Sequence, residues 1–202
     1  MKTGTRTRTR SITHVLPLLL FALLALSCKT TEFGFKVINI NGMVYDFSNR
    51  PVPNYEISLG RKYKGSTDIN GRFTLPRVPV GVYAISGHKN GYENYLEEVI
   101  VKDRGQIIYI RVPSQNQLLN MVDDALASNN FAVAGEMAER AFQIDGNNIE
   151  TLFYNAAVSF RQQQFEKAVF FLELATDLGS KDFYIDKFLS ILREKQNENQ
   201  SN

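Results

Sequence analysis

The sequence is short of the residues that most catalytic and metal sites need. It has no tryptophan, one cysteine, Cys28, and two histidines, His14 and His88. Zinc sites of ordinary type draw on several Cys and His ligands, and a nucleophilic triad needs a histidine base. Only His88 lies beyond Cys28, in Ser86-Gly87-His88-Lys89, where we expect a solvent-facing strand end. We therefore predict a non-enzymatic protein with no catalytic residue, no metal and no cofactor.

No apolar run is long enough to cross a membrane. The longest near the start, Val15–Leu26, has twelve residues interrupted by Pro17, whereas a membrane-spanning helix needs roughly 20. A charged segment without acidic residues precedes it, with basic side chains at Lys2, Arg6, Arg8 and Arg10. A basic start followed by a short apolar core is typical of a secretion signal.

The apolar run ends in Ala25-Leu26-Ser27-Cys28. This end resembles the lipobox of bacterial lipoproteins, although that pattern prefers Leu where Ala25 stands. The resemblance implies a signal peptide at 1–27, cleavage before Cys28, a covalent lipid on Cys28 and a short tether at 28–34. The alternative is an ordinary secretory signal cut near Ala25 or Ser27, which would leave a free thiol near the new terminus.

Lipidation of Cys28 would make the membrane a partner and place the protein in the cell envelope. Several acyl chains on one residue anchor a protein stably, whereas one chain binds marginally. Lys29 follows the cysteine, and the resemblance associates inner-membrane retention with Asp at that place. We therefore expect the outer membrane rather than the inner one.

Removal of the basic leader reverses the charge balance. The whole chain carries +2, but residues 28–202 hold 19 basic and 21 acidic side chains. The basic character thus belongs to the leader, and neither charge nor motif predicts a nucleic-acid partner.

The mature sequence changes character at residue 113. Residues 35–113 are rich in Val, Ile, Tyr and Phe, with turn signals such as Asn70-Gly71, whereas no proline follows Pro113. Ser114 and Gln117 have the spacing of a capping box that opens a helix. We predict a β domain at 35–113 and a helical domain at 114–202. Their charges differ too: residues 33–113 hold 11 basic and 7 acidic side chains, and 114–202 hold 7 and 13.

The β domain is expected to be antiparallel, because no crossover helix fits between its short alternating runs. The predicted strands are 35–45, 55–60, 64–67, 72–75, 82–88, 96–102 and 106–112. Five motifs stand in the order seen in carboxypeptidase regulatory-like domains: Gly42-Met43-Val44-Tyr45-Asp46, Pro51-Val52-Pro53, Thr67–Leu75, Pro79–Tyr83 and Gly91-Tyr92. The resemblance implies a seven-stranded, transthyretin-like β-sandwich without catalytic activity.

The β domain also offers an alternative function as a surface ligand-binding protein, with a glycan or a host matrix protein as ligand. Its basic run Arg61-Lys62-Tyr63-Lys64 could meet acidic glycans or lipid head groups. The competing interpretation is a solvated hairpin edge that prevents strand-to-strand association.

Apolar residues of the helical domain repeat at a spacing of 34. Examples are the pairs Leu119 and Phe153, Leu126 and Phe160, Ala134 and Ala168, and Ala141 and Ala175. The spacing resembles the tetratricopeptide repeat and implies an all-α array of two repeats. Asp182–Lys195 is then a capping helix, whose apolar face would comprise Tyr184, Ile185, Phe188, Leu189 and Leu192.

Repeats of this type mostly bind partner peptides or neighbouring domains on the concave face of their first helices. Carried over by position, that face comprises Asn120, Asp124, Tyr154, Val158 and Arg161. We predict a scaffold that binds an unidentified protein partner there. The competing interpretation is that these are ordinary surface residues on a short spacer.

Overall fold

The computed structural model describes residues 36–200, and the side chains of 36–195. The predicted signal peptide at 1–27, the lipidated Cys28 and the tether at 28–34 lie outside the described residues. No helix within the described range is long and apolar enough to cross a membrane.

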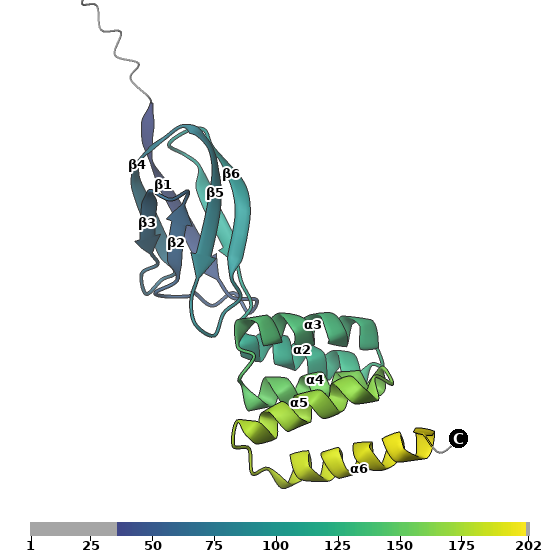
Figure 1. Ribbon diagram of the computed structural model, residues 1–202. Helices are drawn as coiled ribbons and strands as arrows, with labels where there is room; N and C mark the ends of the chain where they lie inside the picture. The colour runs from purple at the N-terminus through teal and green to yellow at the C-terminus, as the bar shows by residue number, and fades with distance from the viewer. Residues whose placement is uncertain (1–35, 201–202) are drawn as a thin grey trace, which may run out of the picture. The chain divides into compact units, whose positions relative to one another are not determined.

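The chain within 36–200 begins with seven strands in two sheets (Figure 1). One sheet has three strands in the order β4-β1-β7, and the other has four in the order β3-β2-β5-β6. The bounds are β1 Val37–Tyr45, β2 Glu56–Leu59, β3 Tyr63–Ser66, β4 Arg72–Pro79, β5 Gly81–His88, β6 Tyr95–Val101 and β7 Ile107–Arg111.

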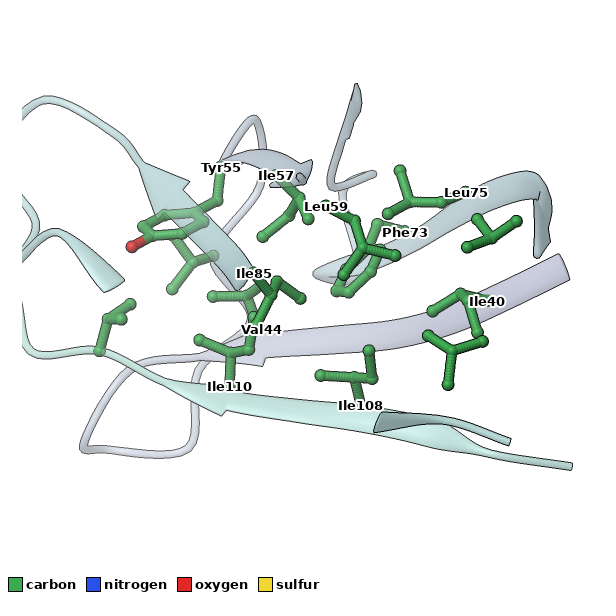
Figure 2. Packing of buried hydrophobic residues seen from close by; sticks show 14 of the residues in the cluster. Ile40, Val44, Tyr55, Ile57, Leu59, Phe73, Leu75, Ile85, Ile108 and Ile110 are labelled. Atoms are coloured by element: carbon green, nitrogen blue, oxygen red, sulfur yellow. The ribbon is translucent and has the colours of Figure 1, made fainter. Parts of the chain in front are cut away.

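The two sheets share one core, and sequence alternation supplies it. Along β1, every second side chain from Ile38 to Val44 is buried, as a pleated strand with one solvated face requires. Figure 2 shows Val44 and Ile110 of the three-stranded sheet beside Ile85 of the four-stranded sheet within this core.

One prediction about this region is wrong. The strands are not all antiparallel, because β1 and β7 run parallel from Asn41↔Ile107 to Tyr45↔Arg111. A parallel pair requires a long crossover between its strands. Here β2 to β6 provide it, so the last strand returns beside the first.

Five helices follow within the described residues: α2 Gln115–Ala127, α3 Phe131–Ile144, α4 Ile149–Arg161, α5 Phe165–Asp177 and α6 Phe183–Gln200. The α+β fold class is therefore confirmed. The starts of α2 and α4, and likewise those of α3 and α5, are separated by the spacing at which the apolar residues repeat in the sequence. Fully buried alanines, among them Ala134, Ala141 and Ala168, let neighbouring helices approach closely.

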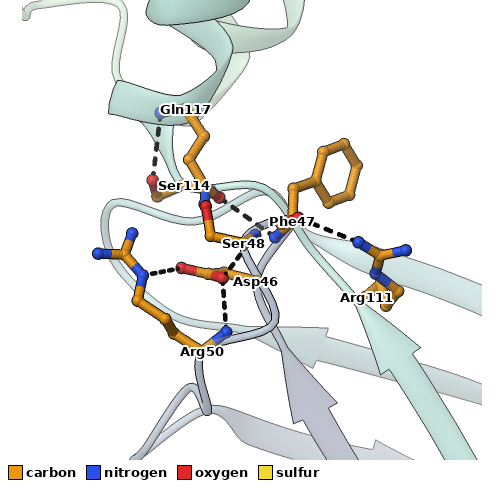
Figure 3. Close-up of polar contacts among 7 residues, drawn as sticks. All are labelled: Asp46, Phe47, Ser48, Arg50, Arg111, Ser114 and Gln117. Carbon is orange, nitrogen blue, oxygen red and sulfur yellow. Dashed lines mark hydrogen bonds and ion pairs between the residues drawn. The ribbon is translucent and has the colours of Figure 1, made fainter.

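The predicted capping box opens α2. The Ser114 hydroxyl accepts a hydrogen bond from Gln117 N at 3.2 Å, and Gln117 Oε1 accepts one from Ser114 N at 3.1 Å. The same glutamine reaches back to the β1–β2 turn, where its Nε2 donates to the Ser48 hydroxyl at 2.8 Å (Figure 3). Further along, the Arg140 guanidinium of α3 holds the Glu93 carboxylate at 2.7 and 2.8 Å.

Asp46 organises the turn that Gln117 contacts. Its buried carboxylate accepts hydrogen bonds from Ser48 N, from Arg50 N and from Arg50 Nε, at 2.8, 2.9 and 2.9 Å (Figure 3). Burial by itself raises the pKa of Asp46, but these hydrogen bonds and the Arg50 charge outweigh it and lower that pKa below its ordinary value. The folded state therefore stabilises the ionised Asp46 carboxylate more than the unfolded state does.

We expect Asp46→Asn to reduce the free energy of unfolding at pH 7 by roughly 1–2 kcal/mol. The contribution of a carboxylate with a lowered folded pKa is complete above its unfolded pKa and is lost as pH falls through the folded one. The difference in the free energy of unfolding between wild type and variant should therefore become smaller below about pH 4. Urea denaturation of mature chains carrying Cys28→Ser, at pH 7 and pH 3, measures this. A gap that does not change with pH would contradict the assignment, and exposed Glu98→Gln is the control.

Candidate partner-binding site

The five residues predicted to face a partner have different surroundings. Asn120 and Asp124 are exposed on α2, and Arg161 is exposed at the end of α4. Tyr154 is half-buried, and Val158 is only 4% exposed. The structure therefore does not bring the five together on one open surface.

Val158 belongs to the helical core rather than to a binding face. It is part of the cluster that includes Leu119 of α2 and Met137 of α3. Gly135 of α3 leaves space for Gln162, because a β-carbon at that glycine would lie 2.8 Å from Gln162 Nε2 and in ordinary contact, at 3.8 Å, with Val158 Cγ1. We correct its placement: Val158 is almost fully buried and joins α4 to the preceding helix pair, and only its edge borders a hollow of about 300 Å³ on the helical region.

Arg161 is occupied by contacts within the chain. Its guanidinium lies 4.6 Å from the centre of the Phe131 ring. It also donates a hydrogen bond from Nη2 to Asn129 Oδ1 at 2.6 Å. The side chain therefore ties the end of α4 to the α2–α3 turn, although it stays exposed.

Two carboxylates act on Tyr154. Burial raises its pKa, and the nearby carboxylates of Asp123 and Glu150 raise it further. It is thus Asp123 that faces α4 and Tyr154. The sequence prediction missed Asp123, and it missed Glu150, which lies one turn before Tyr154 on the same helix face.

A groove opens beside this face of α4. Its walls come from the start of α4 and from the start of α6 with the residue before it: Ile149, Glu150, Phe153, Asp182, Tyr184 and Ile185. We call these six residues the α4–α6 groove, and the cavity they line has a volume of about 440 Å³. Tyr184 is 72% exposed and its neighbour Phe183 is 69% exposed.

Tyr184 was expected to pack on the apolar face of a capping helix. Ile185, Leu189 and Leu192 are buried as predicted, and Phe188 packs against Phe153 with ring centres 6.2 Å apart. Tyr184 instead stands at the rim of the groove. The apolar face of α6 is narrower than the sequence predicted and begins at Ile185.

The groove combines an apolar wall with carboxylates. Phe153 and Ile185 supply the wall, and Glu150 and Asp182 supply negative charge. Such a site fits a large apolar side chain that is flanked by Lys or Arg, because both parts of the ligand then find complementary groups.

Within the part of the chain that the structure describes, the hollow that holds the histidine of the β region lacks the contacts of a catalytic site. A hollow of about 350 Å³ on the four-stranded sheet holds His88 with Glu56, Ser58 and Ser86. His88 Nδ1 lies 2.6 Å from Asn94 Oδ1, and no hydrogen bond joins it to either serine or to Glu56 among the described side chains. Within 36–195, no group of three His, Cys, Asp or Glu side chains is placed to hold a metal.

Comparisons with known proteins do not assign this chain to a family. No protein-family model matches it, and no curated protein matches it. Among solved structures, a type II cohesin–X-dockerin complex from Acetivibrio cellulolyticus is 14% identical, with a TM-score of 0.35, over 40% of this chain and 60% of that one.

Two further solved structures show similarity of the same order. Catechol 1,2-dioxygenase from Pseudomonas arvilla C-1 is 11% identical, with a TM-score of 0.34, over 42% of this chain and 54% of that one. The major pilin subunit of Bacillus cereus is 17% identical, with a TM-score of 0.32, over 39% of this chain and 29% of that one. The chain spans less than two thirds of each of these proteins, and similarity at such TM-scores carries no argument about function.

The corrected placements predict that substitutions at two positions change the free energy of unfolding by different amounts. Val158→Ala should lower the free energy of unfolding by about 1–3 kcal/mol, because it empties space in the helical core. Tyr184→Ala should change it by less than about 0.5 kcal/mol, since the ring is largely in water. Urea denaturation followed by far-UV circular dichroism measures both. Equal losses would show that Tyr184 is a core residue and not a free wall of the groove.

Proposed function

We propose that this protein is a non-enzymatic lipoprotein of the cell envelope, and that its helical region binds a protein partner through the α4–α6 groove. The observation that carries the proposal is the groove itself: it joins the exposed Tyr184 and the half-buried Phe153 to two carboxylates on a surface made by α4 and α6. The partner segment would present an apolar anchor beside a basic residue.

The spacing of the helices supports a tetratricopeptide-like array. Gln115 and Ile149 begin α2 and α4, and Phe131 and Phe165 begin α3 and α5, so both members of the second helix pair follow their counterparts by the same interval. In such an array the first helices of each repeat, here α2 and α4, face the ligand, and α6 takes the place of a further first helix. The groove lies between two of them, α4 and α6.

The turns of the β region support a carboxypeptidase regulatory-like sandwich. Gly71 has a φ of +73°, the left-handed conformation for which glycine is suited, in a turn that leads from β3 of one sheet to β4 of the other and not in the hairpin that the sequence predicted. The Asp68 carboxylate accepts hydrogen bonds from Asn70 N and Arg72 N at 2.8 Å each. Asp68 therefore serves the turn, which accords with a structural module.

Lipidation of Cys28 is the part of the proposal that concerns location, with the outer membrane favoured over the inner one. Its support is the basic start, the short apolar run and the cysteine after Ser27. Growth of producing cells with a labelled fatty acid should label the wild-type chain, and Cys28→Ser should remove the label because the acceptor sulfur is gone. Label that persists on Cys28→Ser would refute the lipid anchor.

Partner binding is tested by photo-crosslinking in intact cells. A photoreactive phenylalanine analogue at Tyr184 should give a crosslinked partner band. The same analogue at Phe170, which is 57% exposed on α5, should give little or none. In the Tyr184 background, Glu150→Lys with Asp182→Lys should reduce the band at least tenfold by reversing the charge of the groove.

The crosslinking experiment also distinguishes partner binding by the groove from the alternative function, ligand binding by the β region. Crosslinks that form only from the β region, for instance from Tyr63 beside the exposed Arg61, Lys62 and Lys64, would favour a surface ligand-binding protein. Equal crosslinking from Tyr184 and Phe170 would argue against a defined groove partner. The charge-reversed chain must retain its far-UV circular dichroism spectrum, so that loss of the band reports on binding.

A further inference from the structure

At one end of the β region, the start of β1 lies near the end of β4, the start of β5 and the end of β6. We call residues 36–39, 76–82 and 100–107 the entry end. They lie together because Val37 pairs with Pro79 and Gly81 pairs with Val101. In addition, Val80 N donates a hydrogen bond to Lys36 O at 3.0 Å. In Figure 1, this is the end of the β region at which β1 begins.

The entry end is strongly basic. It carries four basic side chains and one acidic side chain, Asp103. The Asp103 carboxylate accepts a hydrogen bond from Gly105 N at 2.9 Å and so serves its own turn. No ion pair within 36–195 involves the four cations, which are all exposed: Lys36, Arg77, Lys102 and Arg104.

Aliphatic side chains are exposed among these cations. Val82 is 58% exposed and Ile100, its partner across β5 and β6, is 49% exposed. Val37 and Val80 are 41% and 38% exposed. Aliphatic groups that stand together in water beside cations are typical of surfaces that meet a lipid interface.

Two of the arginines share a cleft. Arg77 and Arg104 line it together with Val37, Asn39 and Asn41, and its volume is about 410 Å³. Arg77 has a φ of +55°, in the left-handed region that is uncommon for side chains other than glycine. Its backbone N donates to Asn39 Oδ1 at 3.1 Å, which fixes the irregular part of β4 that carries it. Two guanidinium groups at one cleft are suited to the oxygens of a phosphate group.

The chain itself limits how far the entry end can lie from an anchored Cys28. Cys28 precedes Lys36 by eight positions, and a fully extended chain spans at most about 3.6 Å per residue. The entry end would therefore stay within roughly 30 Å of the lipid. This step rests on the proposed function, because it takes the lipid to be on Cys28.

We propose that the entry end is a membrane-contact surface for anionic phospholipids, with a head-group phosphate in the cleft between Arg77 and Arg104. Val82 and Ile100 enter the interfacial layer, while Lys36 and Lys102 meet neighbouring anionic head groups. The lipid anchor keeps the protein at the membrane, and contact through the entry end sets the orientation of the β region relative to the membrane.

Vesicle binding tests this surface without the anchor. The mature chain with Cys28→Ser carries no acyl group, so any co-sedimentation comes from the protein surface. We expect it to bind vesicles that contain phosphatidylglycerol in phosphatidylcholine, and not vesicles of phosphatidylcholine alone. Binding should weaken strongly as salt rises from roughly 50 to 500 mM, because the attraction is screened.

Arg77→Ala with Arg104→Ala should weaken binding roughly 25-fold, or about fivefold for each basic residue lost at an anionic surface. The matched control is Arg72→Ala with Lys181→Ala, which removes the same charge from exposed positions outside the entry end and should change binding less than about threefold. Both chains must unfold at the same urea concentration as the parent within error, so that only the surface differs.

Three results would overturn the proposal. Equal binding to neutral and anionic vesicles is one, and equal weakening by the two double substitutions is another. The third is saturable binding of inorganic phosphate by the parent chain without any binding to anionic vesicles, which would make the cleft a site for a soluble anion. Failure of acyl labelling at Cys28 would refute the anchor but leave this assay unchanged, so the two proposals fail separately.

Discussion

The side-chain amide of Gln115 is the contact on which the arrangement of the helical region depends. Its Nε2 lies close to three oxygens, Ala141 O, Asp145 O and Thr151 Oγ1, at 3.2, 3.1 and 2.9 Å. These belong to α3, to the residue after it and to α4, so one buried group fixes three helices. Its backbone N donates to Gly91 O of the β region at 2.9 Å. Loss of this donor would remove a polar contact shared by three helices in the interior, where unmade hydrogen bonds are costly.

α4 shows how one helix can serve both the core and the candidate site. One side, with Leu152, Ala156 and Ser159, is buried. The other side presents Glu150 and Tyr154. Asn155 belongs to the buried side and donates from Nδ2 to Ala138 O and Thr151 O at 3.1 and 2.9 Å. These buried polar contacts fix the rotation of α4 about its own axis, so Glu150 and Tyr154 keep their direction.

Local patterns in the sequence predicted local features well. The Ser114 cap, the regular helix spacing and the alternation along β1 each depend on residues a few positions apart or on simple repetition. The parallel pairing of β7 with β1 could not be predicted, because strand order is set by contacts between distant segments. The cleft was missed for the same reason: Arg77 lies in β4 and Arg104 in the β6–β7 loop, and only the strand order brings them together. Val158 was misplaced because a family position says which helix face is used, not how deeply that face is buried.

The parallel pairing of β1 and β7 has a mechanical consequence. β1 leads from the amino-terminal side and β7 leads into α2, and the two strands are directly hydrogen-bonded along five residue pairs. A pull between the start of β1 and the helices would slide these strands past each other lengthwise. The hydrogen bonds along all five residue pairs would then share the load and would have to break together. If the strands were instead peeled apart from one end, these hydrogen bonds would break one after another. A protein tethered at one end and loaded at the other thus has its two terminal strands joined in the direction that best resists extension.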